Sequence, residues 1–273
     1  MAEETAGGST DELILRIDAG VAYATINRPE SRNALATPVR LALMDFVQRI
    51  KGDPAVRVLL LQATGAGFIA GGDVKAFGEG LKMPAEARGE DMGARAAGAG
   101  ALCVALAELP QPVIVAARGP AVGVGASIVF AADLAILSET AKLRLSHVTL
   151  GISPDGAATW FLPRQVGLKR AGEIALLGDA VTAHEALAMG LVNRVVADAE
   201  LEAAAEALAR RLAIGAPAAL AATKQLLRLS SGRDLASQVA AEADSLRGCA
   251  ATADYAEGLA AILEKRAARF SGA

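Results

Sequence analysis

The amino-acid sequence predicts an α/β fold followed by a helical C-terminal region. A strand pattern, a glycine-rich turn and a helix pattern occur twice in the same order, which suggests a repeated ββα-like unit. From Leu201 onward, periodic Ala and Leu continue without a strand pattern. We therefore predict a flexible N-terminal tail (residues 1–12), an α/β core (13–198) and a C-terminal helical region (199–273).

The predicted core begins with a hairpin and a helix. Residues 13–17 and 21–26 have the composition of strands, and a turn at Ala19-Gly20 joins them. Pro38 fits the first turn of the helix that follows. The apolar residues of this helix recur at a helical period, and they are Leu41, Leu43, Met44, Phe46, Val47 and Ile50.

A buried strand and an irregular stretch come next. The apolar run over residues 56–61 predicts a strand that leads into the first glycine-rich turn (65–73). Residues 79–100 are rich in Gly, Ala, Met and charge without a clear period, so we expect a mobile or partly helical excursion. The later elements are a helix over 101–109, a strand over 112–117, a second glycine-rich turn (119–125) that opens a helix through Ala132, and a strand over 134–137.

The composition narrows the classes of protein. Apolar residues make up 53% of the 273 residues, and the net charge of -3 argues against nucleic-acid or anionic-membrane partners. No apolar run reaches the length of a membrane span, and residues 1–10 lack the apolar segment of a signal peptide. Cys103 and Cys249 form no disulfide framework, and two separated histidines suggest no metal site. We expect a soluble, cytoplasmic protein.

The two glycine-rich turns suggest a way to bind an anionic oxygen. A helix N-terminus exposes unpaired N–H groups, and glycine before it lets a ligand approach the backbone. Two such turns could direct two N–H donors at one developing oxyanion, although each turn alone is better explained by close packing. A dinucleotide site is disfavoured, because no second strand ending in an acid follows the first turn, and a P-loop sequence is absent.

Three segments resemble signature stretches of the crotonase (enoyl-CoA hydratase/isomerase) family, in the family's order: residues 24–35, 68–75 and 119–125. Residues 182–192 and 257–270 match further along, so the resemblance covers nearly the whole chain. It implies a spiral of ββα turns with a C-terminal helical region that builds homotrimers, often paired into hexamers. It also implies a role in fatty acid metabolism and an acyl-CoA substrate. Because coenzyme A is part of that substrate, no separate cofactor is expected.

The resemblance also implies site residues. The oxyanion donors fall on the backbone N–H groups of Gly72 and Val124. The residues implied to contact substrate or coenzyme A are Arg32, Ala34, Ala70, Asp73, Val74, His147 and Trp160, together with Lys265 and Phe270 from a neighbouring subunit. Asp73 also fits the first turn of a helix, where an acid stabilises the dipole. Thr182 and Glu185 form a capping-box pattern, so His184 is expected on a helix surface.

Asp155 is the candidate acid/base. Hydratases of the family use two glutamates, and the matching positions here hold Ser127 and His147. Asp155 lies in a Pro-Asp-Gly stretch, where an aspartate is commonly a turn residue or a helix N-cap. Isomerases of the family place their catalytic aspartate in such a stretch. The resemblance therefore implies that Asp155 moves a proton from C2 to C4 of an enoyl thioester. His147 is expected to be buried and hydrogen-bonded, with an auxiliary acid/base role left open.

Several functions agree with these residues. We favour an enoyl-CoA isomerase of the Δ3-Δ2 or epoxyphenylacetyl-CoA kind. The alternatives are a hydratase (a lyase) that uses His147 or Asp155, and a non-catalytic homologue that binds acyl-CoA. An aryl-CoA dehalogenase is disfavoured, because it needs a nearby histidine and residues 79–100 contain none.

Overall fold

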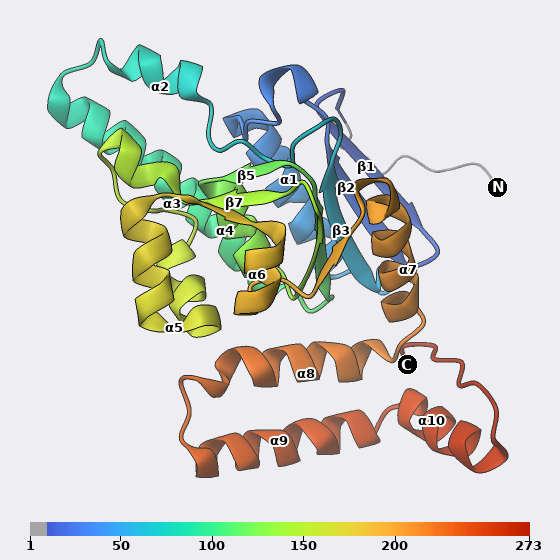
Figure 1. The fold of residues 1–273 in the computed structure, drawn as a ribbon. Helices are drawn as coiled ribbons and strands as arrows, with labels where there is room; N and C mark the ends of the chain where they lie inside the picture. Colours follow the sequence, from blue (N-terminus) through green and yellow to red (C-terminus); the bar gives the residue numbers. More distant parts are fainter. Residues whose placement is uncertain (1–9) are drawn as a thin grey trace.

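The main sheet of the computed structural model has six strands in the order β1-β2-β3-β4-β6-β9 (Figure 1). The structure describes residues 10–273, without the side chains of Val74 and Lys75, and most of the predicted tail lies outside this part. β1 is antiparallel to β2, and the other neighbours are parallel. The strands are β1 (Leu13–Asp18), β2 (Val21–Ile26), β3 (Val58–Ala63), β4 (Val113–Ala117), β6 (Leu134–Ser138) and β9 (Arg194–Val196).

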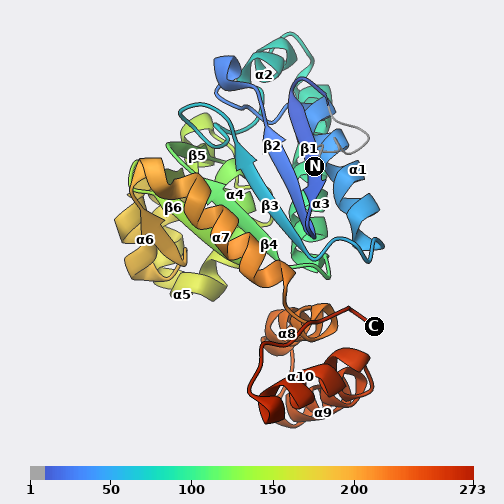
Figure 2. The ribbon, with the colours of Figure 1, turned by 90° about the vertical axis from the view of Figure 1, so that its right-hand side faces the viewer.

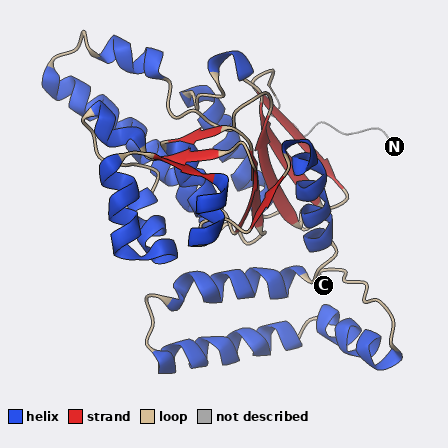
Figure 3. Cartoon of the chain, in the orientation of Figure 1, coloured by secondary structure: helices blue, strands red, loops and turns tan. Residues whose placement is uncertain are grey.

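A second, smaller sheet has the order β5-β7-β8. Its strands are β5 (Pro120–Val122), β7 (Lys142–Arg144) and β8 (Ala180–Thr182). Helices surround both sheets (Figure 3). They are α1 (Thr37–Lys51), α2 (Val74–Gly80), α3 (Ala85–Glu108), α4 (Val124–Ala131), α5 (Ala158–Leu177), α6 (Ala183–Met189), α7 (Leu201–Ala213), α8 (Pro217–Ser230), α9 (Leu235–Ala250) and α10 (Ala253–Glu264), with short 3-10 turns η1 (Pro29–Ser31), η2 (Ser146–Leu150) and η3 (Asp198–Glu200).

The two faces of the main sheet bury different helices. Because side chains alternate along a strand, Leu59 and Leu61 of β3 join the core beneath α1, α3, α4 and α5. Leu60 between them points to the opposite face, which α7 covers (Figure 2). Tyr23 of β2 strengthens this second contact, because its hydroxyl donates to the carboxylate of Glu206 on α7 at 2.7 Å.

The predicted N-terminal hairpin is confirmed. Asp18 pairs with Val21, so the connection has two residues, and Ala19 and Gly20 both have positive φ (44° and 82°). Positive φ at both positions is typical of the tight turns that join antiparallel strands. The capping box is confirmed as well: the Thr182 hydroxyl accepts from the Glu185 N–H at 3.3 Å, and the Glu185 carboxylate accepts from the Thr182 N–H at 2.8 Å.

The stretch at residues 79–100 is more regular than its sequence suggests. α2 ends at Gly80, and α3 is one helix from Ala85 to Glu108. The buried residues of α3 all lie in its C-terminal half, and they are Ala99, Leu102, Cys103, Leu106 and Ala107. The N-terminal half has no buried face, so it carries no apolar period, and two glycines, Gly89 and Gly93, weaken its helical propensity.

The last three helices lie beyond the body of the molecule (Figures 1 and 2). α8 turns back into α9, and α10 leads to the C-terminus. One buried contact ties α8 to the body: Lys224 forms an ion pair with Asp133 at 2.6 Å. Asp133, which lies between α4 and β6, also accepts from the Val113 N–H at 2.7 Å. No helix within residues 10–273 is both long and apolar enough to cross a membrane.

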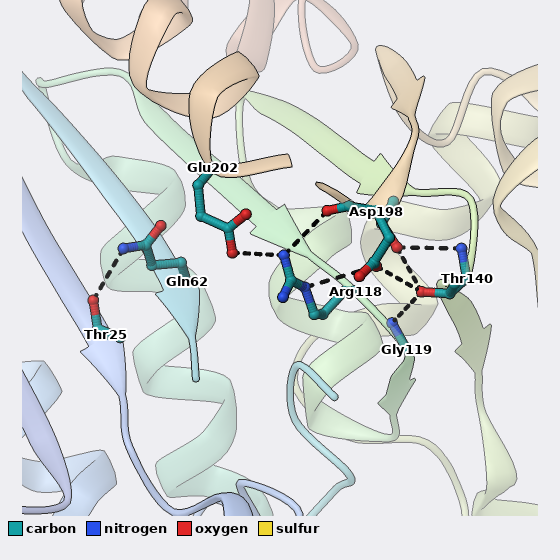
Figure 4. Close-up of polar contacts among 8 residues, drawn as sticks. Thr25, Gln62, Arg118, Gly119, Thr140, Asp198 and Glu202 are labelled. Carbon is teal, nitrogen blue, oxygen red and sulfur yellow. Dashed lines mark hydrogen bonds and ion pairs between the residues drawn. The ribbon is translucent and has the colours of Figure 1, made fainter. Parts of the chain in front are cut away.

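A polar network fixes the start of the second glycine-rich turn (Figure 4). Arg118, which follows β4, donates to Glu202 at 2.6 Å and to the Asp198 carbonyl at 3.2 Å. Thr140 donates to the Asp198 carboxylate at 3.0 Å and accepts from the Gly119 N–H at 3.4 Å. Hydroxyl hydrogen bonds, chiefly from Ser138 and then from Thr140, hold the pKa of Asp198 below its ordinary value. The network therefore attaches this turn to the start of α7.

Candidate active site

The two glycine-rich turns lie against each other, as the sequence predicts for a shared site. Val122 donates its N–H to the Ile69 carbonyl at 2.8 Å, and Ile69 and Ala121 form a β-bridge. A Cβ at Gly125 would collide with the Ile69 carbonyl. Glycine is therefore required where the two backbones meet.

A cavity of about 350 Å³ lies beside this junction. Its lining includes Gly72 from the first turn and Val124, which opens α4 in the second. Within residues 10–273, neither backbone N–H donates a hydrogen bond. Two residues with unused amide donors thus line one cavity, and the donor of Val124 sits at the positive end of a helix. Such an arrangement suits a developing oxyanion.

Asp155 and His147 form a hydrogen-bonded pair in the same cavity. The His147 Nε2 and the Asp155 Oδ1 are 3.1 Å apart. His147 is buried and hydrogen-bonded, as the sequence predicts. Its Nδ1 is also buried and has no partner within the described residues. The Asp155 side chain does not cap α5, whose N-cap is Ala157 without a side-chain hydrogen bond. The contact with His147 therefore replaces the capping role that a Pro-Asp-Gly stretch commonly has.

Ser127 holds the Asp155 backbone in place. Its hydroxyl lies 3.2 Å from the Gly123 carbonyl and 3.1 Å from the Asp155 carbonyl, both acceptors. Gly156 has φ 62°, and a Cβ there would lie 2.6 Å from the Ser127 Cβ. Glycine is therefore required at position 156, where the turn that carries Asp155 approaches Ser127 closely.

Cys103 lies near this turn but offers no nucleophile. Its sulfur is 3.5 Å from where a Cβ of Gly156 would stand, and the residue is fully buried. Burial, with a smaller effect of the Asp155 charge, raises the pKa of the Cys103 thiol to about 12. Near neutral pH the thiol therefore stays protonated and acts as a packing group.

Two further predicted residues, Ala70 and Asp73, line the cavity. Asp73 accepts from the Ala76 N–H at 3.3 Å at the start of α2, which agrees with a helix-stabilising acid. The side chain of Val74 lies outside the described residues. Arg32 and Ala34 do not line the cavity, and each engages the backbone: the Arg32 carbonyl accepts from Ala70, and the Ala34 carbonyl accepts from the Arg28 guanidinium.

The remaining predicted residues lie elsewhere. Trp160 is on α5, outside the cavity, where the Arg164 guanidinium stacks on its ring at 4.0 Å. Lys265 ends α10, and Phe270 packs beside Gly258. Neither lines the cavity of its own chain. Their predicted contact with the nucleotide of a neighbouring subunit's substrate stays a prediction.

Several cavity residues were not found from the sequence. The ring of Phe77 packs on Gly72, because a Cβ at Gly72 would stand 2.5 Å from the Phe77 Cζ. Two arginines, Arg40 of α1 and Arg95 of α3, also line the cavity. The others are apolar or small, and they include Ala99 and Leu150. Arginines on amphipathic helices resemble ordinary surface residues, so the pattern gave no signal.

Comparison with known proteins identifies the family of the chain. A family model described as enoyl-CoA hydratase/isomerase matches residues 16–273. The chain is 34% identical to 1,2-epoxyphenylacetyl-CoA isomerase of Escherichia coli (95% of this chain, 98% of the relative). It is 35% identical to crotonyl-CoA hydratase of Syntrophomonas wolfei (95% and 98%).

A crystal structure of an enoyl-CoA hydratase from Bacillus anthracis matches with a TM-score of 0.89 at 30% identity, over 96% of this chain and 100% of that one. The predicted fold is therefore confirmed. The chain belongs to the crotonase family of enoyl-CoA hydratases and isomerases, and it is an enzyme of that family.

Proposed function

We propose that this enzyme shifts the double bond of an enoyl-CoA thioester, as a Δ3-Δ2 or epoxyphenylacetyl-CoA isomerase does. The observation that supports this most is the Asp155 carboxylate, which shares a cavity with the two unused amides of Gly72 and Val124. Asp73 is the other carboxylate in the described cavity lining, and it is engaged at the start of α2. Asp155 is thus the one carboxylate of the described lining that caps no helix, and a single carboxylate suits a reaction that moves one proton.

The proposed reaction has two proton transfers. The thioester oxygen accepts from the Gly72 and Val124 amides, which stabilise negative charge on it. Asp155 removes a proton from C2, and the electron pair spreads over the oxygen, C2 and C4 as a dienolate. The same carboxyl group then returns the proton to C4, which leaves the double bond between C2 and C3. His147 holds one carboxylate oxygen and leaves the other for the transfer.

A hydratase is the second candidate, because a histidine beside a carboxylate can also activate water. The residues around Asp155 and His147 favour hydration less than isomerisation. Position 127, one of the two that hold a glutamate in hydratases of the family, holds a serine here, and its hydroxyl already faces two backbone carbonyls. A water molecule would thus have one activating group where hydratases of the family use two.

Turnover of paired substrates by wild-type enzyme and Asp155→Asn tests the proposal. We expect 3-hexenoyl-CoA to be converted to the 2-enoyl isomer faster than crotonyl-CoA is hydrated. Asp155→Asn should lower isomerisation roughly 1,000-fold, the range of general acid–base catalysis, while acyl-CoA binding persists. Asp179→Asn, the same change at an exposed aspartate, is the control.

The outcomes separate the candidate functions. Faster hydration than isomerisation would favour the hydratase. Binding without turnover of either substrate would favour a non-catalytic homologue. Full isomerase activity in Asp155→Asn would refute the assigned base.

A further inference from the structure

Two arginines in the cavity have no role in the proposed double-bond shift. Arg40 of α1 and Arg95 of α3 line the same cavity as Asp155, among mostly small and apolar residues. Both arginines are half-buried, so their charges are less shielded by water than at the open surface and favour an anion or acceptor nearby. The partners of the two guanidinium groups therefore indicate what the cavity holds.

Arg95 has its partners within the protein. Its Nε lies 2.7 Å from the Asp91 carboxylate, one turn earlier on α3. Its guanidinium also sits 5.7 Å from the centre of the Phe77 ring. Both contacts hold it at the cavity wall with its charge partly neutralised.

Arg40 differs, because its side chain makes no hydrogen bond or ion pair within residues 10–273. Its guanidinium lies against α3 at Gly98, where a Cβ would stand 2.5 Å from the Arg40 Cζ. Glycine inside a helix lowers helical propensity, and here it leaves the space that the guanidinium occupies. The donors of Arg40 thus remain unused beside the cavity.

We propose that Arg40 binds a carboxylate at the far end of the acyl group, so that the substrates include coenzyme A thioesters of dicarboxylic acids. This inference rests on the proposed acyl-CoA function and adds the substrate class. A guanidinium presents parallel N–H donors that match both oxygens of a carboxylate. Arg95 flanks the position and adds positive charge, while Met92 and Ile152 of the same lining suit the methylene chain.

A phosphate of coenzyme A offers the same anionic chemistry. The size of the cavity favours the acyl carboxylate. About 350 Å³ is at the small end of ligand sites, so it fits an acyl group and part of the pantetheine but leaves the nucleotide outside. Arg40 lines this space together with His147 and Asp155, where the acyl group must lie for the proposed reaction.

Binding of saturated thioesters tests the inference without any turnover. Calorimetry would compare adipoyl-CoA with hexanoyl-CoA, and glutaryl-CoA and suberyl-CoA with their monoacid partners, because the best chain length has to be found. We expect at least one dicarboxylic thioester to bind roughly tenfold more tightly than its partner, as for a charge-assisted hydrogen bond. Arg40→Met should remove this preference.

Two further variants keep the outcome interpretable. Arg49→Met changes an exposed arginine of the same helix that pairs with Asp45, and it should leave the preference intact. Gly98→Ala should displace the guanidinium and reduce the preference while the charge remains. A thermal melt shows whether each variant is folded.

The results that would overturn the role of Arg40 differ from those that would overturn the proposed isomerase activity. Equal binding of acid and monoacid thioesters by the wild type at every length would overturn the inference. A loss in Arg40→Met that is the same for both thioesters would assign Arg40 to a coenzyme A phosphate and overturn it too. A carboxylate preference in an enzyme without isomerase activity would instead refute only the proposed double-bond shift.

Discussion

At the scale of single residues, His147 decides which oxygen of Asp155 is available. Its Nε2 faces Asp155 Oδ1 at 3.1 Å, while its buried Nδ1 lacks a partner within the described chain. An N–H at Nδ1 would be a buried donor without an acceptor, which is unfavourable. The tautomer with its proton on Nε2 avoids this and donates to the carboxylate. His147 is then a positioning residue for Asp155.

Kinetics of His147 variants test that role. We expect His147→Ala to lower kcat roughly 100-fold with little change in KM, because a displaced catalytic group loses its alignment with the substrate. His147→Gln, whose amide can still donate, should recover part of the loss. His184→Ala, a change at the other histidine, which is exposed, should leave kcat and KM unchanged. Equal losses in the Ala and Gln variants, or an effect on KM alone, would contradict positioning.

The sequence allowed some of these residues to be located and not others. Resemblance to the family located Asp155, Gly72, Val124 and His147, all of which line the cavity. Trp160 follows Asp155 by only five residues yet lies outside it, because α5 begins in between and turns this side chain toward α8. Sequence proximity therefore fails as a guide once a helix intervenes.

At the scale of elements, one buried ion pair attaches α8 to the body. Besides Asp133, Lys224 donates to the carbonyls of Leu106 and Gln111, both at 3.2 Å. Burial raises the pKa of Asp133 and lowers the pKa of Lys224, so each charged form depends on its partner. Loss of one partner would leave the other charge largely buried.

Unfolding of single and double variants measures this dependence. Lys224→Met should lower the free energy of unfolding by about 3 kcal/mol, as for a buried pair that loses one partner. Adding Asp133→Asn should restore most of it, because the amide oxygen can still accept from Val113. Urea denaturation at one fixed protein concentration is the measurement, because assembly would change apparent stability. A double variant no better than Lys224→Met would contradict this account.

A helix can be predicted from the sequence when it buries one apolar face, because that face gives a periodic pattern. α1 was predicted from its apolar period, and Leu43, Phe46, Val47 and Ile50 are indeed buried. The first half of α3 gave no such period because it packs on no core. Its position instead serves the cavity, which Met92 and Arg95 line. Residues selected to contact a ligand need not follow the pattern that reveals a helix.

At the scale of the whole molecule, much of the apolar surface of the C-terminal helices stays uncovered by the rest of residues 10–273. Apart from the ion pair of Lys224, neither α8 nor α9 buries a side chain against the rest of the described chain. Leu235, Leu246 and Ile262 are 81%, 68% and 75% exposed. Helices of this length are marginal alone in water, and apolar surface on this scale marks an interface. We propose that another copy of the chain covers it, as in the homotrimer or pair of trimers that the family resemblance implies.

Assembly should therefore control both oligomeric state and coenzyme A affinity. Light scattering is expected to give three or six times the chain mass. Leu246→Glu with Ile262→Glu should reduce that mass, because charges would be buried at the interface. Leu41→Glu, an exposed apolar residue of α1, is the control.

The variant with the lower assembly mass should also bind coenzyme A thioesters more weakly. Lys265 and Phe270 lie outside the cavity of their own chain, and they are predicted to reach the nucleotide bound by a neighbouring subunit. Phe270→Ala should reproduce the weaker binding without changing the mass. A monomeric wild type would refute the assembly itself. A dissociated variant that binds acyl-CoA as tightly as the wild type would refute the shared site.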